Sequence, residues 1–404
     1  MMEGAGAQKR NATSYPRASA ALDGLVVIDL THVRAGPVCV RQLADWGANV
    51  IRVERPGNPD DFSTRSDSDF INRHRNKRSI SINLRDPEGR DVLLRLARNA
   101  DVFVENFRPD VKHRLGIDYE TLRAINPRLI YVSISAFGQD GPYRDRPGVD
   151  QIIQGMSGLM SITGEPGRGP MRVGFPISDV IAGLCAALGV FVALTERQKS
   201  GEGQWVQTSL LEAQMFALDL QSARYLVDGI VAGQVGNEHP TGVPTNTYRT
   251  RDGYVNIAPI PAMWPRFCKA LGREDLIEHP DYSTRGRRRK HRAEVNSIVQ
   301  GIVGEMDSKS VIERLMQHEV PCGPIYTIGE AFEDPQAKQL ALGQTVTKDG
   351  AEIALPRQPF TLSRTPSVLA CAPPQFAEHT REVLAEFGYS ESEIERLSAS
   401  GAIQ

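Results

Sequence analysis

The 404-residue sequence has few cysteines, and they are not arranged for a metal site or a disulfide framework. The five are Cys39, Cys185, Cys268, Cys322 and Cys371, an odd number without a CxxC pair. Disulfide scaffolds and structural zinc sites both need paired cysteines at short spacing. We therefore expect reduced, buried thiols in a reducing, cytoplasmic compartment.

Several catalytic and cofactor motifs are also absent. There is no GxSxG nucleophile elbow, and the eight histidines show neither HExxH nor another metal-ligand spacing. The GxGxxG fingerprint of dinucleotide-binding folds is missing as well. These absences argue against a nucleotide-dependent oxidoreductase, and we expect no metal and no tightly bound cofactor.

The sequence shows no charge excess that would favour nucleic acid or a membrane surface, since its formal net charge is -2. Its one dense basic run, 285–292, is interpreted as a solvated helix start, with a nucleic-acid patch as the alternative. The sixteen uncharged residues after Asp179 fall short of the roughly twenty that a spanning helix needs. We interpret them as an apolar helix at the centre of a large core.

Strands and helices alternate in the first half of the chain. Short apolar runs at 25–30, 49–54, 79–84, 101–107 and 129–137 are expected to be strands. Helices are expected at 37–47, with Pro37 in the first turn, and at 86–100, where acidic residues start the helix and basic ones end it. This pattern predicts an α/β fold with a doubly wound parallel sheet of Rossmann type.

The domain organisation follows from changes in composition. Residues 1–21 have no apolar core and are expected to form a disordered tail. The large domain is expected at 22–227, a Gly- and Pro-rich linker at 228–247, and a smaller α+β domain at 248–335, which starts with a hairpin. Residues 336–404 end in two short helices.

Asp179 has two possible roles. It is the only charged residue between Arg172 and Glu196, and it stands where the long apolar helix should begin. An aspartate at this position can be an ordinary helix cap that accepts hydrogen bonds from the first backbone N–H groups. The same helix end can keep a poorly hydrated carboxylate ionised, and such a carboxylate can act as a nucleophile.

Basic residues follow the first strands. His32 and Arg34 lie between the first strand and the first helix, next to a helix N-terminus that can bind an anion. Arg55 follows the second strand, where an arginine suits a ribose phosphate. Residues 73–80, with four Arg or Lys among them, form either a solvated loop or a phosphate cradle.

Five segments together resemble the class III CoA-transferases, the family of the formyl-CoA:oxalate and carnitine CoA-transferases. The resemblance spans residues 22–390. The segments are LDGLVVIDLTHVRAGPVCVRQLADWGANVIRVERPG (22–57), NKRSISINLRDPEGRDVLLRLARNADVFVENFRP (76–109), PGVDQIIQGMSGLMSITGEP (147–166), the region 178–213 and VPCGPIYTIGEAFEDPQ (320–336).

The resemblance implies a Rossmann-like large domain built from both chain ends, a small inserted domain and an interlocked homodimer. It places the family's catalytic aspartate at Asp179, so the same carboxylate would be both helix start and nucleophile. Asp179 would attack an acyl-CoA thioester, and the reaction would pass through an anhydride and an aspartyl-CoA thioester to a new carboxylic acid. CoA is then the transferred group rather than a bound cofactor.

The resemblance also assigns CoA contacts by position. They fall on the loop after the first strand, on the ends of later strands and on one helix: His32, Val33, Ala35, Arg55, Ile82, Arg85, Asn106, Phe107 and Arg114.

Four residues and one loop depart from the oxalate enzymes or from the racemases of the same superfamily. Arg34 replaces a glutamine. It suits a second substrate carboxylate, which favours a dicarboxylic acid as in the succinyl-CoA-dependent members of the family, or alternatively a CoA phosphate. Ser135 and Phe137 replace a lysine and a tyrosine of the oxalate enzymes, and Phe137 is expected to contact substrate. The loop 241–246 lacks the run of glycines that closes over the active site in those enzymes, so we do not expect oxalate specificity. Val149 replaces the histidine base of the α-methylacyl-CoA racemases, which favours a transferase over a racemase. A CoA-binding protein without activity is the remaining alternative.

Overall fold

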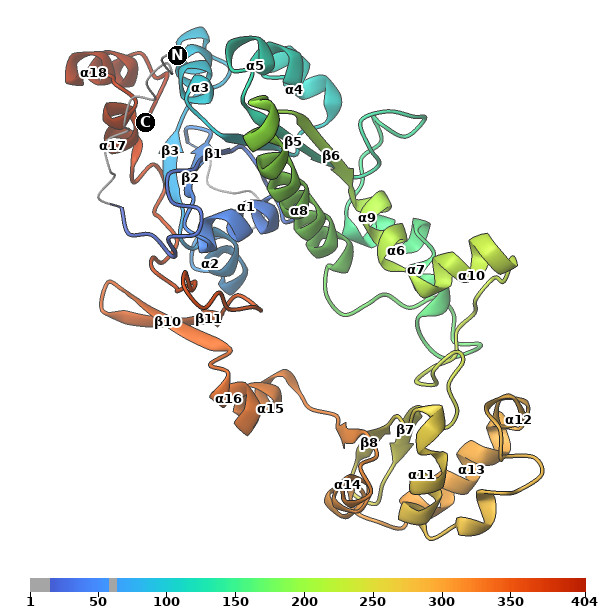
Figure 1. Cartoon of the computed structure of the whole chain (residues 1–404). Helices are drawn as coiled ribbons and strands as arrows, with labels where there is room; N and C mark the ends of the chain where they lie inside the picture. The colour runs from blue at the N-terminus through green and yellow to red at the C-terminus, as the bar shows by residue number, and fades with distance from the viewer. Residues whose placement is uncertain (1–14, 58–63) are drawn as a thin grey trace, which may run out of the picture. The chain divides into compact units, whose positions relative to one another are not determined.

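The computed structural model describes residues 15–57 and 64–404, which divide into two compact units (Figure 1). The first unit contains the chain up to Gly158, Val173–Ala223 and Lys338–Gln404, and the second contains Leu159–Arg172 and Arg224–Ala337. Residues 159–172, which the sequence analysis assigned to the large domain, therefore group with the second unit.

The first unit is built on a six-stranded parallel sheet with the order β3-β2-β1-β4-β5-β6. Its strands are β1 (Val26–Asp29), β2 (Asn49–Glu54), β3 (Arg78–Ser81), β4 (Val102–Glu105), β5 (Ile130–Ser135) and β6 (Trp205–Ser209). This is the strand order of doubly wound dinucleotide-binding folds, in which the order of the strands reverses between β1 and β4, at the switch point of the sheet. The predicted α/β fold with a parallel sheet is confirmed.

Helices cover both faces of this sheet. They are α1 (Ala35–Asp45), α2 (Ser68–His74), α3 (Pro87–Arg98), α4 (Pro109–Leu115), α5 (Tyr119–Ile125), α6 (Asp150–Met156), α8 (Ile177–Ser200), α9 (Leu210–Ala217), α17 (Thr380–Glu386) and α18 (Glu391–Ala399). Neighbouring strand residues point to opposite faces, so Val27 packs in the core under α1 and α8, and Ile28 packs in the core with α3, α17 and α18.

Helix α8 lies beside α1, and only one of its faces is buried (Figure 1). Apart from Arg197, its buried side chains are small. A Cβ atom at Gly183 would lie 2.5 Å from the carbonyl oxygen of Ala35. Glycine therefore lets the start of α8 approach the start of α1. The opposite face exposes Leu184, Leu188 and Val192, so the expectation of burial all round is wrong.

Helix α8 is also the one helix in the described part of the chain that is long and apolar enough to cross a membrane by length and composition. It packs against α1, α9, β5 and β6 of the first unit. Only the side that faces these elements is buried, so the prediction of a core helix holds for that side alone.

The chain ends return to the sheet. Helix α17 packs against β3, and Val383, Leu384, Ile394 and Leu397 join the core. The expected disordered tail lies outside the described residues up to residue 14. From Tyr15 on that expectation is wrong, because the Tyr15 hydroxyl donates to the Lys77 carbonyl at 2.8 Å and Ala18 is 2% exposed.

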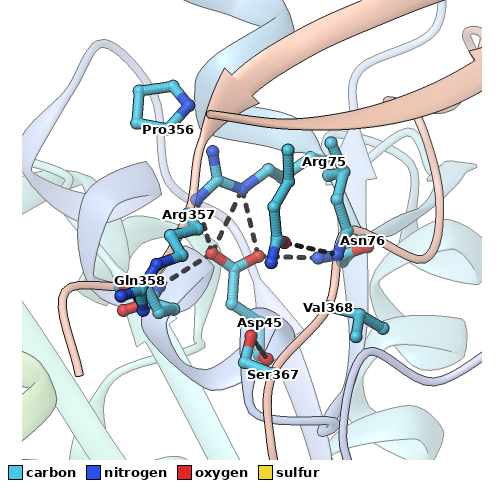
Figure 2. A pocket seen from close by; sticks show the side chains of 10 residues that line it. Asp45, Arg75, Asn76, Pro356, Arg357, Gln358, Ser367 and Val368 are labelled. Atoms are coloured by element: carbon cyan, nitrogen blue, oxygen red, sulfur yellow. Dashed lines mark hydrogen bonds and ion pairs between the residues drawn. The ribbon is translucent and has the colours of Figure 1, made fainter. Parts of the chain in front are cut away.

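Two polar contacts tie the return segment to α1 and β3. At the end of α1, the Asp45 carboxylate accepts hydrogen bonds from Arg75, Asn76 and Gln358, each at 2.7 Å, in a small pocket (Figure 2). At β3, the Arg78 guanidinium pairs with Glu382 and Glu386 of α17. The hairpin of β10 (Gly343–Lys348) and β11 (Ala351–Pro356), which we did not expect, precedes this segment.

The basic run 73–80 is neither a solvated loop nor an open cradle. Lys77 and Arg78 are fully buried, and Lys77 pairs with Asp29 at 3.1 Å. Arg75 pairs with Asp45 at 2.7 Å. The run therefore supplies interior ion pairs. Their acidic partners lie far away in the sequence, so no local pattern predicts the pairs.

The second unit has a three-stranded antiparallel sheet, β7-β8-β9, surrounded by helices. Its elements are α7 (Leu159–Ile162), β7 (Asn246–Arg249), β8 (Tyr254–Ile257), η1 (Pro261–Met263), α11 (Trp264–Leu271), η2 (Glu274–Leu276), α12 (Arg285–Lys290), α13 (Arg292–Val303), α14 (Ser308–Gln317), β9 (Cys322–Pro324) and α15 (Ile328–Glu333). Two further helices, α10 (Leu220–Asp228) and α16 (Pro335–Gln339), span its boundaries.

The basic run 285–292 forms α12 and the start of α13, as expected for a helix. Arg288 is not solvated, however, because its guanidinium lies 4.5 Å from the ring centroid of Trp264 and donates to the Tyr282 carbonyl at 2.8 Å. This arginine is part of the core of the second unit.

Candidate active site

Asp179 is the third residue of α8, and it does not cap the helix. The cap position is Pro176, and no side chain of α8 itself accepts the first N–H groups. The Asp179 side chain is 9% exposed, and no hydrogen bond or ion pair joins it to another residue within 15–57 or 64–404. The interpretation of Asp179 as an ordinary cap is therefore wrong.

The cap comes from another helix. Asp150, the first residue of α6, accepts a hydrogen bond from the Ser178 backbone N–H at 2.8 Å. Its second carboxylate oxygen accepts from Gln154 Nε2 at 2.7 Å. Ser178 Oγ in turn donates to Gln214 Oε1 of α9 at 2.9 Å. The start of α8 is thus fixed by buried side chains from α6 and α9, immediately beside Asp179.

Burial and charge set the protonation of Asp179. Desolvation by burial and the nearby Asp150 carboxylate raise the pKa of Asp179 to about 7, and the guanidinium groups of Arg34 and Arg73 oppose this rise. A carboxyl with this pKa is ionised in a large fraction of molecules at neutral pH. It also carries more basicity than an ordinary aspartate, which suits a nucleophile.

Arg34 binds a carboxylate of the chain itself. Its two terminal nitrogens donate to the two oxygens of Asp69 on α2, both at 2.8 Å. Arg73 also pairs with Asp69, at 3.1 Å, and donates to the Val33 carbonyl. One carboxylate is therefore shared by two guanidinium groups close to Asp179, in a geometry suited to bidentate carboxylate binding.

The loop after β1 meets the end of β4 at the switch point of the sheet. The His32 backbone N–H donates to Asn106 Oδ1 at 2.9 Å, and Asn106 Nδ2 donates back to the His32 carbonyl at 2.8 Å. The His32 and Phe107 rings lie 5.9 Å apart. Val33 has a φ of 61°, a strained value for a β-branched residue. In folds of this kind, ligands bind at this crevice.

The structure brings together only part of the predicted site. His32, Val33 and Asn106 are joined as described, with Phe107 beside them and Ala35 starting α1. Arg55, Arg85 and Arg114 are exposed after β2, after β3 and on α4. Ile82 is 1% exposed, so its side chain belongs to the core rather than to an open site. Phe137 follows β5, with its ring 5.7 Å from that of Tyr143.

Sequence reasoning did not single out Asp69, Asp150, Gln154 or Gln214. Asp150 stands next to Val149, the position where this sequence departs from the histidine of the racemases. An aspartate that starts α6 could have been noted as a helix-terminal acid, but its bond to Ser178, 28 residues later, has no signal in the sequence. No group of three or more His, Cys, Asp or Glu side chains able to hold a metal occurs among the residues that the structure describes.

The fold and this site define an α/β protein with a buried carboxyl in the first turn of α8, whose pKa is raised to about 7. Comparison with known proteins gives the family. The family model for CoA-transferase family III matches residues 22–380. The succinate–glutarate CoA-transferase of Agrobacterium fabrum is 38% identical over 389 residues, 93% of this chain and 97% of that protein.

Two further relatives agree. The succinyl-CoA–D-citramalate CoA-transferase of Chloroflexus aurantiacus is 35% identical over 95% of this chain and 98% of that protein. The crystal structure of a CAIB/BAIF family protein from Brucella suis has a TM-score of 0.79 at 34% identity, and the match covers 91% of this chain and 100% of that chain. The protein belongs to CoA-transferase family III and is a CoA-transferase, as the resemblance predicted.

Proposed function

We propose that this CoA-transferase moves CoA from succinyl-CoA to a dicarboxylic acid, with Asp179 as the covalent nucleophile. The observation that carries this proposal is the Asp179 carboxyl itself, which is buried, free of hydrogen bonds within the described chain, and has a pKa raised to about 7. The relatives named for glutarate and citramalate support the choice of donor and acceptor class.

In the first half-reaction, an Asp179 oxygen attacks the thioester carbonyl of the acyl-CoA. The C–S bond breaks, CoA leaves as the thiolate, and an acyl-aspartyl anhydride remains. The thiolate then attacks the aspartyl carbonyl of the anhydride. The donor leaves as its carboxylate, and Asp179 carries CoA as a thioester.

The second half-reaction runs these steps in reverse on the acceptor. A carboxylate of the acceptor attacks the aspartyl thioester carbonyl. The C–S bond breaks, the CoA thiolate leaves, and the acceptor and Asp179 are joined as the second anhydride. The thiolate attacks the acceptor's acyl carbon, the new acyl-CoA forms, and Asp179 returns as a carboxylate. No proton is gained or lost over the cycle, and the thioester bond is conserved.

CoA is proposed to lie along the carboxyl edge of the sheet. The loop of His32, Val33 and Ala35 and the pair Asn106 and Phe107 would contact its pantetheine arm at the switch point. The exposed guanidinium groups of Arg55, Arg85 and Arg114 suit its phosphates. Ile82 would contribute only through its backbone.

Arg34 is proposed to recognise the second carboxylate of the dicarboxylic acid. It already binds the Asp69 carboxylate with two hydrogen bonds, so a substrate carboxylate would exchange with Asp69 or share the guanidinium. The charge of Arg34 opposes the rise in the pKa of Asp179, which supports a position near the proposed nucleophile. Phe137 would line the acyl site.

A homodimer is proposed for the assembly, with the large domain built from both chain ends. The exposed apolar side chains of α8 and α9 in the first unit, among them Leu188 and Phe216, give such a dimer an interface to cover. A cytoplasmic location is proposed because all five cysteines are free thiols.

Two rival functions receive less support. In a racemase of the same superfamily, a base would be needed at position 149, but Val149 is an apolar side chain at the start of α6. A protein that only binds CoA would not need a buried carboxyl free of hydrogen bonds. Neither rival explains why another acid caps α8 in place of Asp179.

The experiment incubates the protein with succinyl-CoA and a panel of mono- and dicarboxylic acids. Mass spectrometry follows new CoA thioesters and weighs the peptide that contains Asp179. We expect a new thioester with a dicarboxylic acid and a CoA adduct on that peptide, which hydroxylamine removes. Thioester exchange without an adduct would contradict the covalent role of Asp179, and binding without exchange would favour a CoA-binding protein.

A further inference from the structure

Two carboxylates lie at the start of α8, and they have different surroundings. The Asp150 carboxylate is 7% exposed and accepts hydrogen bonds from the Ser178 backbone N–H and from Gln154 Nε2. The Asp179 carboxyl, one residue beyond Ser178, accepts none within the described chain. Usually a single acid near a helix start accepts these N–H bonds. Here one acid accepts them and the other is left without them.

We propose that Asp150 is a positioning residue of the transfer reaction: it holds the free N–H at the start of α8 in place of Asp179, and its negative charge keeps Asp179 a strong nucleophile. The proposal rests on the proposed function of Asp179 and adds a role for a residue that never touches the substrate. Asp150 then has a structural and electrostatic role, and Asp179 is the group that reacts.

The physical reason lies in what a hydrogen bond does to a nucleophile. A carboxylate that accepts helix N–H bonds is stabilised, so its pKa falls and its lone pairs are occupied. An aspartate at the third position of a helix is within reach of such bonds. If Asp150 already holds the Ser178 N–H, both Asp179 oxygens stay available for the thioester carbonyl.

The charge of Asp150 acts in the same direction. A like charge nearby disfavours ionisation and makes the remaining carboxylate more basic. The charged groups that act on Asp179 are Asp150 of α6, Arg34 before α1 and Arg73 of α2, and the two arginines oppose Asp150. Helix α9 contributes the neutral Gln214, which accepts from Ser178 Oγ.

Asp150 is itself rigidly held, as a positioning residue must be. Gln154, one turn along α6, donates to Asp150 and accepts from the Val173 backbone N–H at 2.9 Å. Gln154 Nε2 also lies 3.3 Å from the Phe175 carbonyl. One face of α6 therefore fixes both the start of α8 and the segment that leads into it.

The test compares Asp150→Asn with Asp150→Ala. Asn keeps an oxygen for the Ser178 N–H but removes the charge, whereas Ala removes both. Asn also turns an amide N–H₂ toward Gln154 Nε2, so thermal unfolding is measured to separate a loss of stability from a change in chemistry. Asp145→Asn is the matched control, because it also removes one carboxylate but its side chain is 71% exposed.

The readout is the pH dependence of CoA adduct formation on the Asp179 peptide in a single turnover. For Asp150→Asn we expect the midpoint of the acid limb to fall by about one pH unit and the rate at high pH to fall several-fold. For Asp150→Ala we expect a similar fall in the midpoint and a larger loss of rate, on the order of a hundredfold, since Asp179 can then cap α8 itself. Asp145→Asn should behave as the wild type.

An unchanged acid-limb midpoint in both Asp150 variants would overturn the proposal. This holds even if the variants were less stable, because a residue that only caps the helix would change stability and leave the midpoint where it is. If Asp150→Asn does not fold, the midpoint of Asp150→Ala decides alone. Failure of the proposed function looks different: the wild type would then form no adduct on the Asp179 peptide at any pH.

Discussion

At the scale of single residues, burial and the nearby Asp150 carboxylate together raise the pKa of the Asp179 carboxyl to about 7. Asp179 stands out as an isolated charge before an apolar run, and the resemblance placed the catalytic aspartate there. His32 and Asn106, which the resemblance assigned to CoA contacts, hydrogen-bond to each other because they follow neighbouring strands. Asp150 and Asp69 were missed because their partners lie 28 and 35 residues away, in bonds that only the folded chain creates.

The activity of the wild type should rise with pH through about 7. Attack requires the carboxylate, and burial together with Asp150 raises the pKa of Asp179 to about 7. Below this pH the active fraction should fall about tenfold per unit. Steady-state kcat/KM for succinyl-CoA between pH 5 and 9 measures the midpoint. A midpoint near 4, the ordinary value for an aspartate, would contradict the role of burial.

Removing the charge of the Asp179 carboxylate should stabilise the fold at high pH. The pKa of Asp179 is raised in the folded state, so its contribution to stability is present below the unfolded value of 3.8 and is lost as pH rises through about 7. Asp179→Asn should therefore gain up to about 4 kcal/mol over the wild type at pH 8 and almost nothing at pH 4. Denaturant unfolding at the two pH values measures this; an equal effect at both would count against it.

Arg34 and Asp69 should set the preference for dicarboxylic acids. Arg34→Gln should raise the KM for a dicarboxylic acceptor about tenfold or more and leave a monocarboxylic acceptor nearly unaffected, because only the former offers a second carboxylate. Asp69→Asn should lower the KM for the dicarboxylic acid, since Arg34 then loses its internal partner. Equal changes for both acceptor classes would show that Arg34 acts on CoA instead.

At the scale of elements, the strands were predictable because buried parallel strands are continuous apolar runs. The β10–β11 hairpin was missed, although Asp349 and Gly350, both with positive φ, form the Asp-Gly turn that signals a tight hairpin. The basic run 73–80 was misread, because no local rule reveals that Asp29, Asp45 and Glu386 would fold around it. Local patterns predict elements well, and they do not predict the pairing of charges between elements.

The close approach of α8 and α1 should depend on Gly183. Gly183→Ala would place a Cβ 2.5 Å from the Ala35 carbonyl oxygen, so the start of α8 must shift, and Asp179 lies one turn away. We expect a loss of about 1–3 kcal/mol in unfolding free energy and a clear loss of kcat. Gly301→Ala is the matched control in α13, where nothing lies within 4 Å of the added Cβ.

The control should gain stability by about 0.5–1 kcal/mol, since alanine is the better helix residue. Thermal or denaturant unfolding and initial rates measure both variants. Equal behaviour of the two variants would show that the contact at Gly183 is loose and that the position of Asp179 does not depend on it.

At the scale of the whole molecule, the apolar face of α8 needs a partner. Leu184, Leu188 and Val192 are 46%, 63% and 62% exposed, at helical spacing along one face. Composition alone suggested that this helix would be buried on all sides, and a single chain buries only one side. The hydrophobic effect favours covering such a strip, and the proposed homodimer would do so.

Leu188→Lys should therefore weaken the dimer. Light scattering of the wild type should give about twice the mass of one chain, and a lysine on this face should shift the variant toward the mass of one chain at low concentration, because its charge would be buried without a partner. Leu362→Lys serves as the control, since Leu362 is also an exposed leucine of the first unit, 40% exposed, but lies outside this face. A wild type with the mass of one chain would refute the dimer. A Leu188→Lys variant that keeps twice that mass at every concentration would show that the dimer leaves this face uncovered.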